Sequence, residues 1–193
     1  MNNDRLTHKA EERRRFMTNV KSFALSGTAI ALMSGMNTAC AENITREQDV
    51  TQDIRILNTA IAAEHEAVAA YQLGAESGLL SAGVLKVAVT FQGHHKEHID
   101  LLASTVRTLG GVAVDAREQY HFPLNQLKQE SDVLGFAAGL ERGAISAYAG
   151  AIPAFGNSDL AKAAASILAD EAMHWAILRQ ALGLDPVPGA FFS

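Results

Sequence analysis

The sequence predicts an all-α protein, a four-helix bundle made of two antiparallel helical hairpins joined by a long crossover. The 193 residues are 48% hydrophobic but only 6% aromatic, which indicates one domain with a core of small aliphatic side chains. Alanine is abundant between about residues 60 and 182, proline is nearly absent there, and β-branched runs are short, so helix is favoured locally. The formal charge of −5, without clustered Lys and Arg in the body of the chain, argues against a nucleic-acid partner.

The first 41 residues differ from the rest and predict an export signal. Arg13-Arg14-Arg15-Phe16-Met17 precedes a mildly apolar stretch, residues 23–36, and then Ala39-Cys40-Ala41. A basic, an apolar and a small-residue region in this order are typical of export signals, and the arginines followed by Phe16 resemble a twin-arginine signal. The apolar stretch is too short for a transmembrane helix. We expect twin-arginine export to the periplasm or beyond; a basic arm on a cytosolic protein is the alternative.

Removal of the signal after Ala41 would leave ten basic and eighteen acidic residues and no cysteine. Disulfides and thiolate metal sites would then be excluded. A lipid anchor on Cys40 is the less favoured reading, because Asn37 stands where a lipobox has an aliphatic residue. Whether the signal is cleaved stays open.

The predicted bundle domain, residues 42–185, begins with a first hairpin. Its first helix should start near Thr45, since Thr45 and Gln48 are spaced as a capping box, and end near residue 76. A second helix is predicted over residues 82–109. It should stop at Gly110-Gly111, because glycine readily takes the left-handed conformation that follows a helix.

The second hairpin is predicted in the same way. Ser131 and Asp132 offer N-caps for a third helix, which meets Pro153. A fourth helix is capped near Ser158 and ends at Leu182, before Gly183.

Loop lengths predict how the helices connect. The loops within each hairpin are short, so the flanking helices should be antiparallel. The middle connection, residues 110–130, has about 21 residues and at roughly 3.3 Å per residue can run the length of a bundle. This crossover and the tail, residues 186–193, are candidate contacts for a homodimer.

The two hairpins look like copies of each other. AEHEAVAAY, residues 63–71, matches LERGAISAY, residues 140–148. HKEHIDLL from His95 matches EAMHWAIL from Glu171. The separation from Glu64 to His98 is 34 residues, and that from Glu141 to His174 is 33. This agreement links four polar positions without reference to any other protein.

Each helix places polar residues on its apolar seam near mid-length. In the first helix, alternating steps of three and four give Ile54, Leu57, Ile61, Glu64, Val68 and Tyr71, the stripe that faces a bundle core. The other three stripes contain His95 with His98, Glu141, and Glu171 with His174. Tyr71 and Tyr148 are expected to be core tyrosines with satisfied hydroxyls.

Clustered acids on buried seams predict a metal site. Burying charged carboxylates together would cost several kcal/mol per charge, and a cation in their midst removes that penalty. Residues three apart on a helix point the same way, so Glu171 and His174 can hold one ion. Oxygen and imidazole donors without sulfur suit iron, manganese or zinc. The candidate metal residues are Glu64, His95, His98, Glu141, Glu171 and His174.

Residues 45–183 resemble ferritin-like domain proteins. Their four-helix bundles carry a Glu on each of two helices and Glu-x-x-His on each of the other two. Glu64 and Glu141 match the single acids, and Glu171 with His174 matches one pair in full. The resemblance implies a di-iron or di-manganese carboxylate centre, with oxygen or peroxide chemistry or iron handling among its uses. Within the family, the chain is similar to the exported bacterial branch.

His95 departs from this resemblance. The family pattern has a Glu there, which in relatives bridges the two metals, so Glu171 is left as the matching bridge. Three carboxylates supply −3 against the +4 of two divalent ions, which makes a single ion, or a zinc or manganese site, an open alternative.

Other readings stay open. His94-His95-Lys96-Glu97-His98 fits the zinc-protease pattern H-x-x-E-H, although that leaves the acids of the other helices unexplained. His94 is a candidate for an entrance residue or for supporting a ligand rather than being one, and which of His94 and His95 is the ligand is undecided. A non-catalytic exported scaffold or stress-related protein without metal is the alternative function.

Overall fold

The computed structural model describes residues 38–192, with side chains from residue 46 onward. Most of the predicted export signal, and the side chain of Cys40, therefore lie outside the described residues. The bundle lies within the unit that begins at Arg46. Across residues 38–192, none of the helices has both the length and the apolar character needed to span a bilayer.

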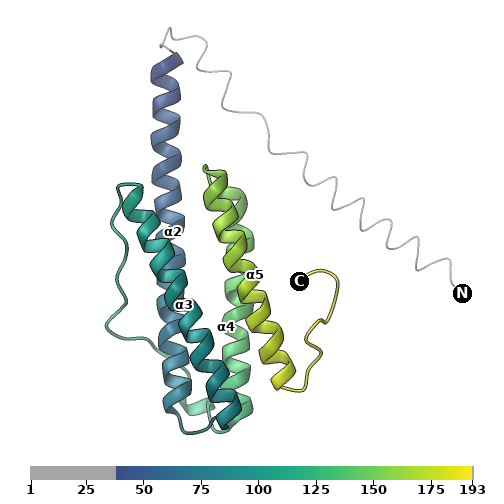
Figure 1. Ribbon diagram of the computed structural model, residues 1–193. Coiled ribbons are helices and arrows are strands. Elements are labelled where there is room, and N and C mark those ends of the chain that lie inside the picture. Colours follow the sequence, from purple (N-terminus) through teal and green to yellow (C-terminus); the bar gives the residue numbers. More distant parts are fainter. Residues whose placement is uncertain (1–37, 193) are drawn as a thin grey trace, which may run out of the picture. The chain divides into compact units, whose positions relative to one another are not determined.

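Four α-helices account for the described chain, in agreement with the predicted all-α class (Figure 1). They are α2 (Thr38–Glu76), α3 (Ala82–Thr108), α4 (Glu130–Ala151) and α5 (Ser158–Ala181). Two single 3₁₀ turns, η3 (Leu124–Gln126) and η4 (Ile152–Ala154), lie in the connections. The long crossover from α3 to α4 runs along the outside of the bundle, as predicted (Figure 1).

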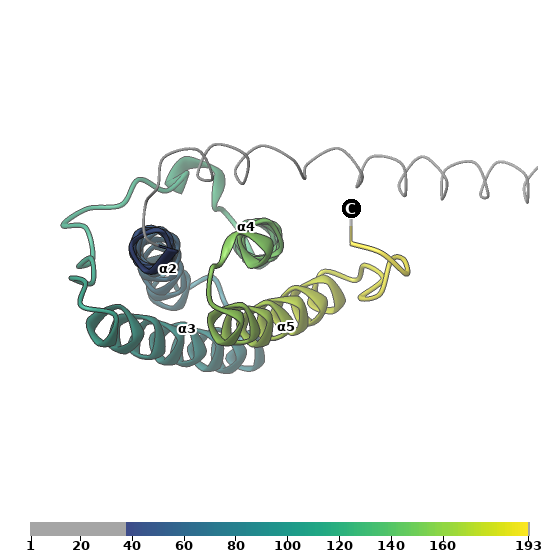
Figure 2. The same cartoon turned by 90° about the horizontal axis from the view of Figure 1, so that it is seen from above.

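The arrangement seen from above places α3 beside α5, and α2 across from α4 (Figure 2). Each hairpin thus contributes one helix to the α3–α5 side and one to the α2–α4 side. Three glycines with positive φ end the helices where the sequence predicted: Gly78 (φ 70°), Gly110 (φ 83°) and Gly183 (φ 71°). Only glycine takes this conformation without a steric penalty on Cβ.

Helix starts were predicted less well than helix ends. The helix α2 begins at Thr38, so the N-cap predicted at Thr45 is wrong. Residues 38–44 contain no Gly or Pro that would stop a helix from extending backward. The N-cap of α4 is Gln129 rather than Ser131, and Asp132 is instead the third residue of the helix, accepting the backbone N–H of Gln129 at 3.1 Å. The cap of α5 is Asn157, next to the predicted Ser158.

Two hydrophobic clusters stabilise the bundle and leave a polar layer between them. One cluster includes Ile61, Leu102 and Ile167; the other includes Phe91 and Leu178. On every helix, the predicted polar residues fall between a member of the first cluster and a member of the second. Burial of these aliphatic and aromatic side chains supplies the main driving force for folding, and it surrounds the polar layer with low-dielectric packing.

Candidate metal centre

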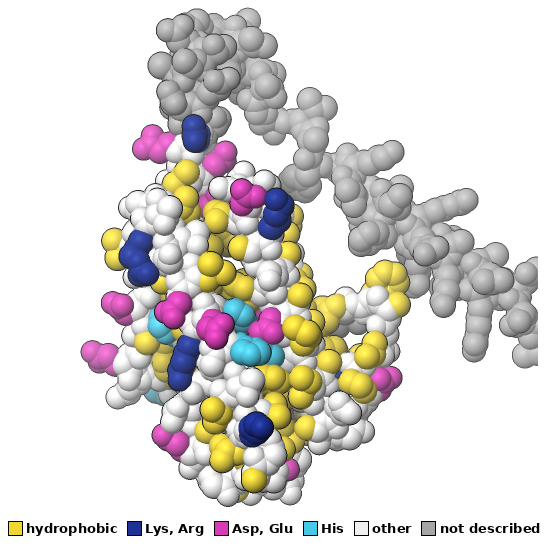
Figure 3. Space-filling view, in the orientation of Figure 1, with side chains coloured by type: hydrophobic (Ala, Val, Ile, Leu, Met, Phe, Trp, Pro, Cys, Tyr) yellow, Lys and Arg dark blue, Asp and Glu magenta, His cyan; other side chains and the backbone are white. Residues whose placement is uncertain are grey.

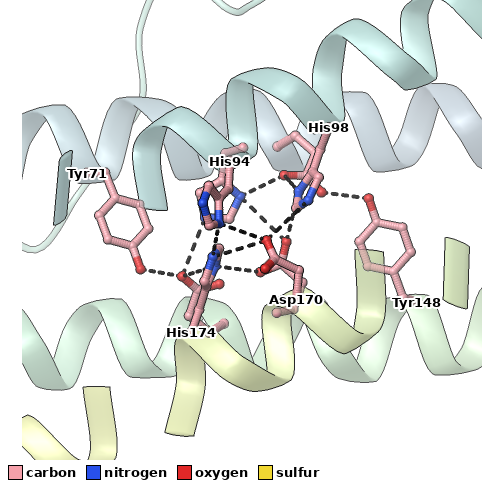
Figure 4. Close-up of polar contacts among 10 residues, drawn as sticks. Tyr71, His94, His98, Tyr148, Asp170 and His174 are labelled. Atoms are coloured by element: carbon pink, nitrogen blue, oxygen red, sulfur yellow. Dashed lines mark hydrogen bonds and ion pairs between the residues drawn. The ribbon is translucent and has the colours of Figure 1, made fainter. Parts of the chain in front are cut away.

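All six residues predicted from the seams meet in the interior. Glu64 comes from α2, Glu141 from α4, and the others come in pairs from α3 and α5: His95 with His98, and Glu171 with His174. Five of the six side chains are at most 3% exposed, and His98 is 12% exposed. Figure 4 shows two of them, His98 and His174, pointing into the same network of polar contacts as Asp170.

One group of donors lies toward Glu64. The Glu64 Oε2 atom is 2.7 Å from His95 Nδ1 and 3.4 Å from His98 Nδ1. Glu171 Oε1 lies 3.2 Å from His98 Nδ1. One donor atom from each of these four residues lies within 4.8 Å of the others, a spread compatible with ligands around a single ion.

A second group lies toward Glu141 and shares two members with the first. Glu141 Oε1 is 3.4 Å from His95 Nε2 and 3.5 Å from His174 Nδ1. Glu171 Oε2 is 3.6 Å from His174 Nδ1. The donor atoms of these four residues also lie within 4.8 Å of one another. Glu171 and His95 belong to both groups, so the interior contains two adjoining candidate ion positions.

Four buried atoms of this layer have no hydrogen-bond partner. They are His95 Nε2, His174 Nδ1 and both carboxylate oxygens of Glu171. Buried polar atoms are almost always paired, and leaving one unpaired costs about 1–3 kcal/mol. A cation among these atoms would satisfy all four, so the residues present fit a bound metal.

Asp170 was not predicted from the sequence, yet it contacts three histidines. Its Oδ2 atom lies 3.1 Å from His174 Nε2, 3.4 Å from His98 Nε2 and 3.1 Å from His94 Nδ1. The negative charge of Asp170 close to both Nε2 atoms favours a proton there, so that in its neutral form each ring would keep the lone pair of Nδ1 toward the interior. Asp170 lies four residues before His174, so both side chains lie on one face of α5. The prediction from the apolar seams did not take this spacing into account.

His94 lies at the surface edge of the centre. Its side chain is 40% exposed, and its Nδ1 atom is 2.9 Å from His174 Nε2. Asp170 is 21% exposed, and Figure 3 shows histidine and acidic side chains together on this face. We call the polar surface formed by His94 and Asp170, between α3 and α5, the polar mouth. With His174 these two residues form a third group of possible metal donors, so an entrance role for His94 stays a prediction. The ring of Phe91 stacks on His174 with centroids 3.9 Å apart and holds its orientation.

Two tyrosines connect the first helix of each hairpin to the other hairpin. Tyr71 of α2 donates its hydroxyl to Glu141 of α4, and Tyr148 of α4 donates to Glu64 Oε1 of α2 at 2.6 Å. Both are buried core tyrosines with satisfied hydroxyls, as expected from the sequence. Burial and the adjacent carboxylate raise the pKa of each hydroxyl well above its usual value.

The metal-free centre balances its charges through its histidines. Burial works against the charged form of every group here, but the Glu141 and Glu64 carboxylates outweigh it and raise the pKa of His95 to about 10. At His98 and His174, burial likewise lowers the pKa, but the neighbouring carboxylates outweigh it and raise the pKa to about 9 and about 8, respectively. In the absence of metal, these imidazoles are therefore protonated at neutral pH.

The three carboxylates are not equivalent. Burial raises the pKa of Glu64, but its hydrogen bonds and charge contacts with His95 and His98 lower it to about 2 overall. Histidine contacts likewise lower the pKa of Glu141 despite burial. Burial and the neighbouring Glu141 raise the pKa of Glu171. Glu171 is thus the acid whose charge the protein alone satisfies least.

The protease alternative finds no support in this arrangement. Glu97, which would be its general base, is an exposed residue of α3. It belongs to none of the candidate metal groups among the described residues. The two histidines of the motif, His94 and His98, belong to different candidate groups, and the buried His95 stands at a variable position of the motif.

Comparisons with known proteins agree with the fold. The chain resembles a conserved hypothetical protein from Mycobacterium tuberculosis, with 22% identity and a TM-score of 0.64 over 74% of this chain and 99% of that chain. It also resembles a dodecameric thioferritin from Bacteroides fragilis, described as bacterioferritin-related, with 26% identity and a TM-score of 0.62 over 74% and 93%. A ferritin-like diiron-carboxylate protein from Bacillus anthracis gives 22% identity and a TM-score of 0.60 over 69% and 97%.

No match was found among curated proteins. The model of the ferritin-like domain family matches residues 52–184, which include α3, α4, α5, most of α2 and every residue of the centre. The chain therefore belongs to the ferritin-like domain family.

Proposed function

We propose that this protein binds iron in the interior of the bundle and uses it for redox chemistry with oxygen or peroxide, or for iron handling. The observation that carries the proposal is the set of four unpaired buried atoms, which belong to His95, Glu171 and His174 and lie within one layer. Manganese and zinc suit the same oxygen and nitrogen donors. The diiron-carboxylate description of the Bacillus anthracis protein supports iron first.

The two groups of donors suggest a role for each ligand. Glu64 and Glu141 would be terminal ligands, because each belongs to one group. Glu171 belongs to both and has both oxygens unpaired, so it would bridge two ions or chelate one. His98 and His174 would each provide Nδ1.

His95 makes the two positions unequal. A neutral imidazole has one lone pair, so His95 can serve the ion near Glu64 or the ion near Glu141, but not both. We therefore propose one tightly bound ion and a second, weaker position.

The protein's own contribution to the chemistry is ligand geometry and a dry pocket. Bound iron would supply a redox-active Lewis acid. Asp170 would orient the histidines, and the two hydrophobic clusters pack against the layer of ligands from both sides. Tyr71 and Tyr148 hold the terminal acids by hydrogen bonds.

The test is an oxidation assay on the reconstituted protein. Protein loaded anaerobically with Fe(II) should react with oxygen or peroxide faster than the same iron in buffer, read as ferric absorbance. Glu171→Gln should abolish the acceleration, and Glu97→Gln, an exposed acid of α3, should keep it. Equal rates for wild type and Glu171→Gln would refute the redox proposal.

A metal-free scaffold is the second candidate function. The observation in its favour is that protonated histidines can neutralise Glu64 and Glu141 in the interior without any bound ion. Absence of bound transition metal after purification and after reconstitution would favour it.

We also propose export through the twin-arginine machinery, on the basis of Arg13, Arg14 and Phe16 in the sequence. That route carries folded proteins, so the metal would be acquired in the cytoplasm. Replacing Arg13 and Arg14 with Lys together should retain the protein in the cytoplasm on cell fractionation, whereas Arg5→Lys should not.

A further inference from the structure

A cleft between α2 and α4 leads to the centre from the side opposite the polar mouth. Its volume is about 380 Å³, within the range of about 300–1,000 Å³ typical of small-molecule pockets. Small side chains make up much of its walls, three from α2 and four from α4: Ala60, Ala63, Ala67, Gly143, Ala144, Ala147 and Ala151. Ile56, Leu57 and Leu140 line it as well. This space, the α2–α4 cleft, stays open where the small residues of the two helices face each other.

The floor of the α2–α4 cleft is the candidate metal centre itself. Glu64, His95, Glu141 and Tyr148 line it. The His95 side chain is 1% exposed, and its Nε2 atom has no hydrogen-bond partner. One end of a molecule bound in the cleft would therefore lie next to His95 Nε2, a buried polar atom without a hydrogen-bond partner, rather than next to apolar side chains.

The tyrosine–glutamate pairs explain why the helices do not close over this space. Tyr148 reaches from α4 to Glu64 of α2, and Tyr71 reaches from α2 to Glu141 of α4. Both rings are buried, so each bond fixes the separation of the two helices by the length of a tyrosine side chain. Small residues beside such fixed spacers leave a cavity instead of allowing a close helix contact.

The chemistry of the walls selects what can enter. Besides the residues of the floor, only Thr59 and Glu66 among the lining residues are polar. Apolar walls offer water few hydrogen-bond partners, and they disfavour a free ion. Polar and charged side chains reach the surface instead at His94 and Asp170, between α3 and α5. The α2–α4 cleft is consequently suited to an uncharged molecule.

We propose that the α2–α4 cleft binds a neutral, largely apolar organic molecule with one end at the carboxylate–histidine centre. Its role as a substrate rests on the proposed redox function, whereas its binding does not. The small-residue walls favour a narrow, chain-like shape over a bulky ring system, because the space lies along the two facing helices.

The experiment uses 1-octanol as the probe, titrated calorimetrically into the full chain in metal-loaded and metal-free forms. Ala144→Leu and Ala67→Leu fill the cleft from its two opposite walls, at half-buried positions that are not proposed ligands but lie one helical turn from Glu141 and Glu64. Ala149→Leu is the matched control, since Ala149 is an exposed residue of α4 that does not line the cleft. Metal content is measured for each variant by elemental analysis.

We expect saturable binding of one octanol per wild-type chain, at least tenfold weaker in both filled variants and unchanged in the control, with metal content the same throughout. Absence of saturable binding, or equal binding in the filled variants, would overturn the proposal. Octanol binding to a protein that takes up no metal would uphold the cleft and remove the redox function. Dissociation of a dimer by Ala144→Leu, without octanol binding, would assign the cleft to a second copy instead.

Discussion

Each of two site histidines presents its two nitrogen atoms to different surroundings. His98 and His174 turn Nδ1 toward the buried carboxylates and Nε2 toward Asp170. A carboxylate that accepts the Nε2–H of a histidine fixes its tautomer and raises the basicity of the other nitrogen. Asp170 is thus placed to favour the Nε2–H form of one histidine from each hairpin.

Asp170→Asn should weaken metal binding by about 10–100-fold, the usual cost of losing such a supporting partner. The amide keeps the size of the side chain but removes the negative charge that favours the Nε2–H form. Competition with a chromogenic chelator measures the affinity. Asp100→Asn, at an exposed position of α3, is the control, and equal affinities in the two variants would contradict the role given to Asp170.

The pH dependence of stability follows from the same histidines. The pKa values of His95, His98 and His174 are raised to about 10, 9 and 8 in the metal-free fold, above the ordinary value of about 6.5. Groups whose pKa rises on folding stabilise the fold fully below about pH 6.5, and this stabilisation is lost as pH passes through the raised values.

The melting temperature of the metal-free protein should therefore fall between pH 7 and pH 10. Metal requires neutral imidazoles, so metal affinity should rise over the same interval. Calorimetric scans at several pH values test both trends. His98→Gln should flatten the first trend, and a melting temperature that stays constant to pH 10 in the wild type would be inconsistent with these shifts.

His95→Glu should increase the number of ions bound per chain. The substitution gives α3 the Glu-x-x-His pair that α5 already has, and a second carboxylate can bridge where one imidazole cannot. We expect occupancy to rise toward two ions per chain in equilibrium dialysis with Fe(II) under anaerobic conditions. Unchanged stoichiometry would mean that His95 does not limit the second position.

At the scale of elements, the two hairpins support the centre by equivalent contacts. Each contributes one helix with a single acid and a tyrosine, and one helix with a pair of ligands three residues apart. The acid of each hairpin accepts a hydrogen bond from the tyrosine of the other. The acids and tyrosines that match between the two hairpins in the sequence are therefore also hydrogen-bonded from one hairpin to the other.

The connection from α4 to α5 is fixed to α2 by a buried acid. Asp53 is 2% exposed and accepts the backbone N–H of Gly156 at 2.8 Å. A Cβ atom added at Gly156 would lie 2.7 Å from Asp49 Cβ, closer than packed atoms allow.

Gly156→Ala should destabilise the protein by about 1–3 kcal/mol, the usual cost of overpacking. Gly150→Ala is the opposite case, because Gly150 lies within α4 with no atom within 4 Å of an added Cβ. It should stabilise by about 0.5–1 kcal/mol through helix propensity. Urea unfolding of both variants measures the difference, and a shift of the same sign in both would argue against this account of the connection.

The sequence predicted the seam residues because helical periodicity is local. Glu64, Glu141 and Glu171 each fall in an apolar stripe, and stripes must face the core. Asp170 and His94 lie outside the apolar stripes of their helices. Their contact depends on the distance between α3 and α5, which cannot be predicted from the sequence of either helix alone. The α2–α4 cleft could not be predicted for the same reason. From the sequence, its alanines are expected to pack in the core, but the hydrogen bonds of Tyr71 and Tyr148 hold α2 and α4 apart.

At the scale of the whole molecule, the centre is bordered by two surfaces of opposite character. Between α3 and α5 lie the partly exposed side chains of His94 and Asp170, and histidine and acidic side chains gather on this face (Figure 3). Between α2 and α4 the centre opens into an apolar cleft. The ferritin-like bundle fixes the layer of ligands, and these two sides are where this chain could differ from its structural neighbours in what reaches the layer.

The most direct test is elemental analysis of the purified protein, alone and as Glu171→Gln. Glutamine mimics the protonated acid that burial favours at this position, so the variant should fold while losing a ligand. We predict at least one iron, manganese or zinc ion per wild-type chain, little or none in Glu171→Gln, and wild-type content in Glu97→Gln. A wild-type protein without metal after reconstitution, or equal metal in Glu171→Gln, would contradict a metal centre in this bundle.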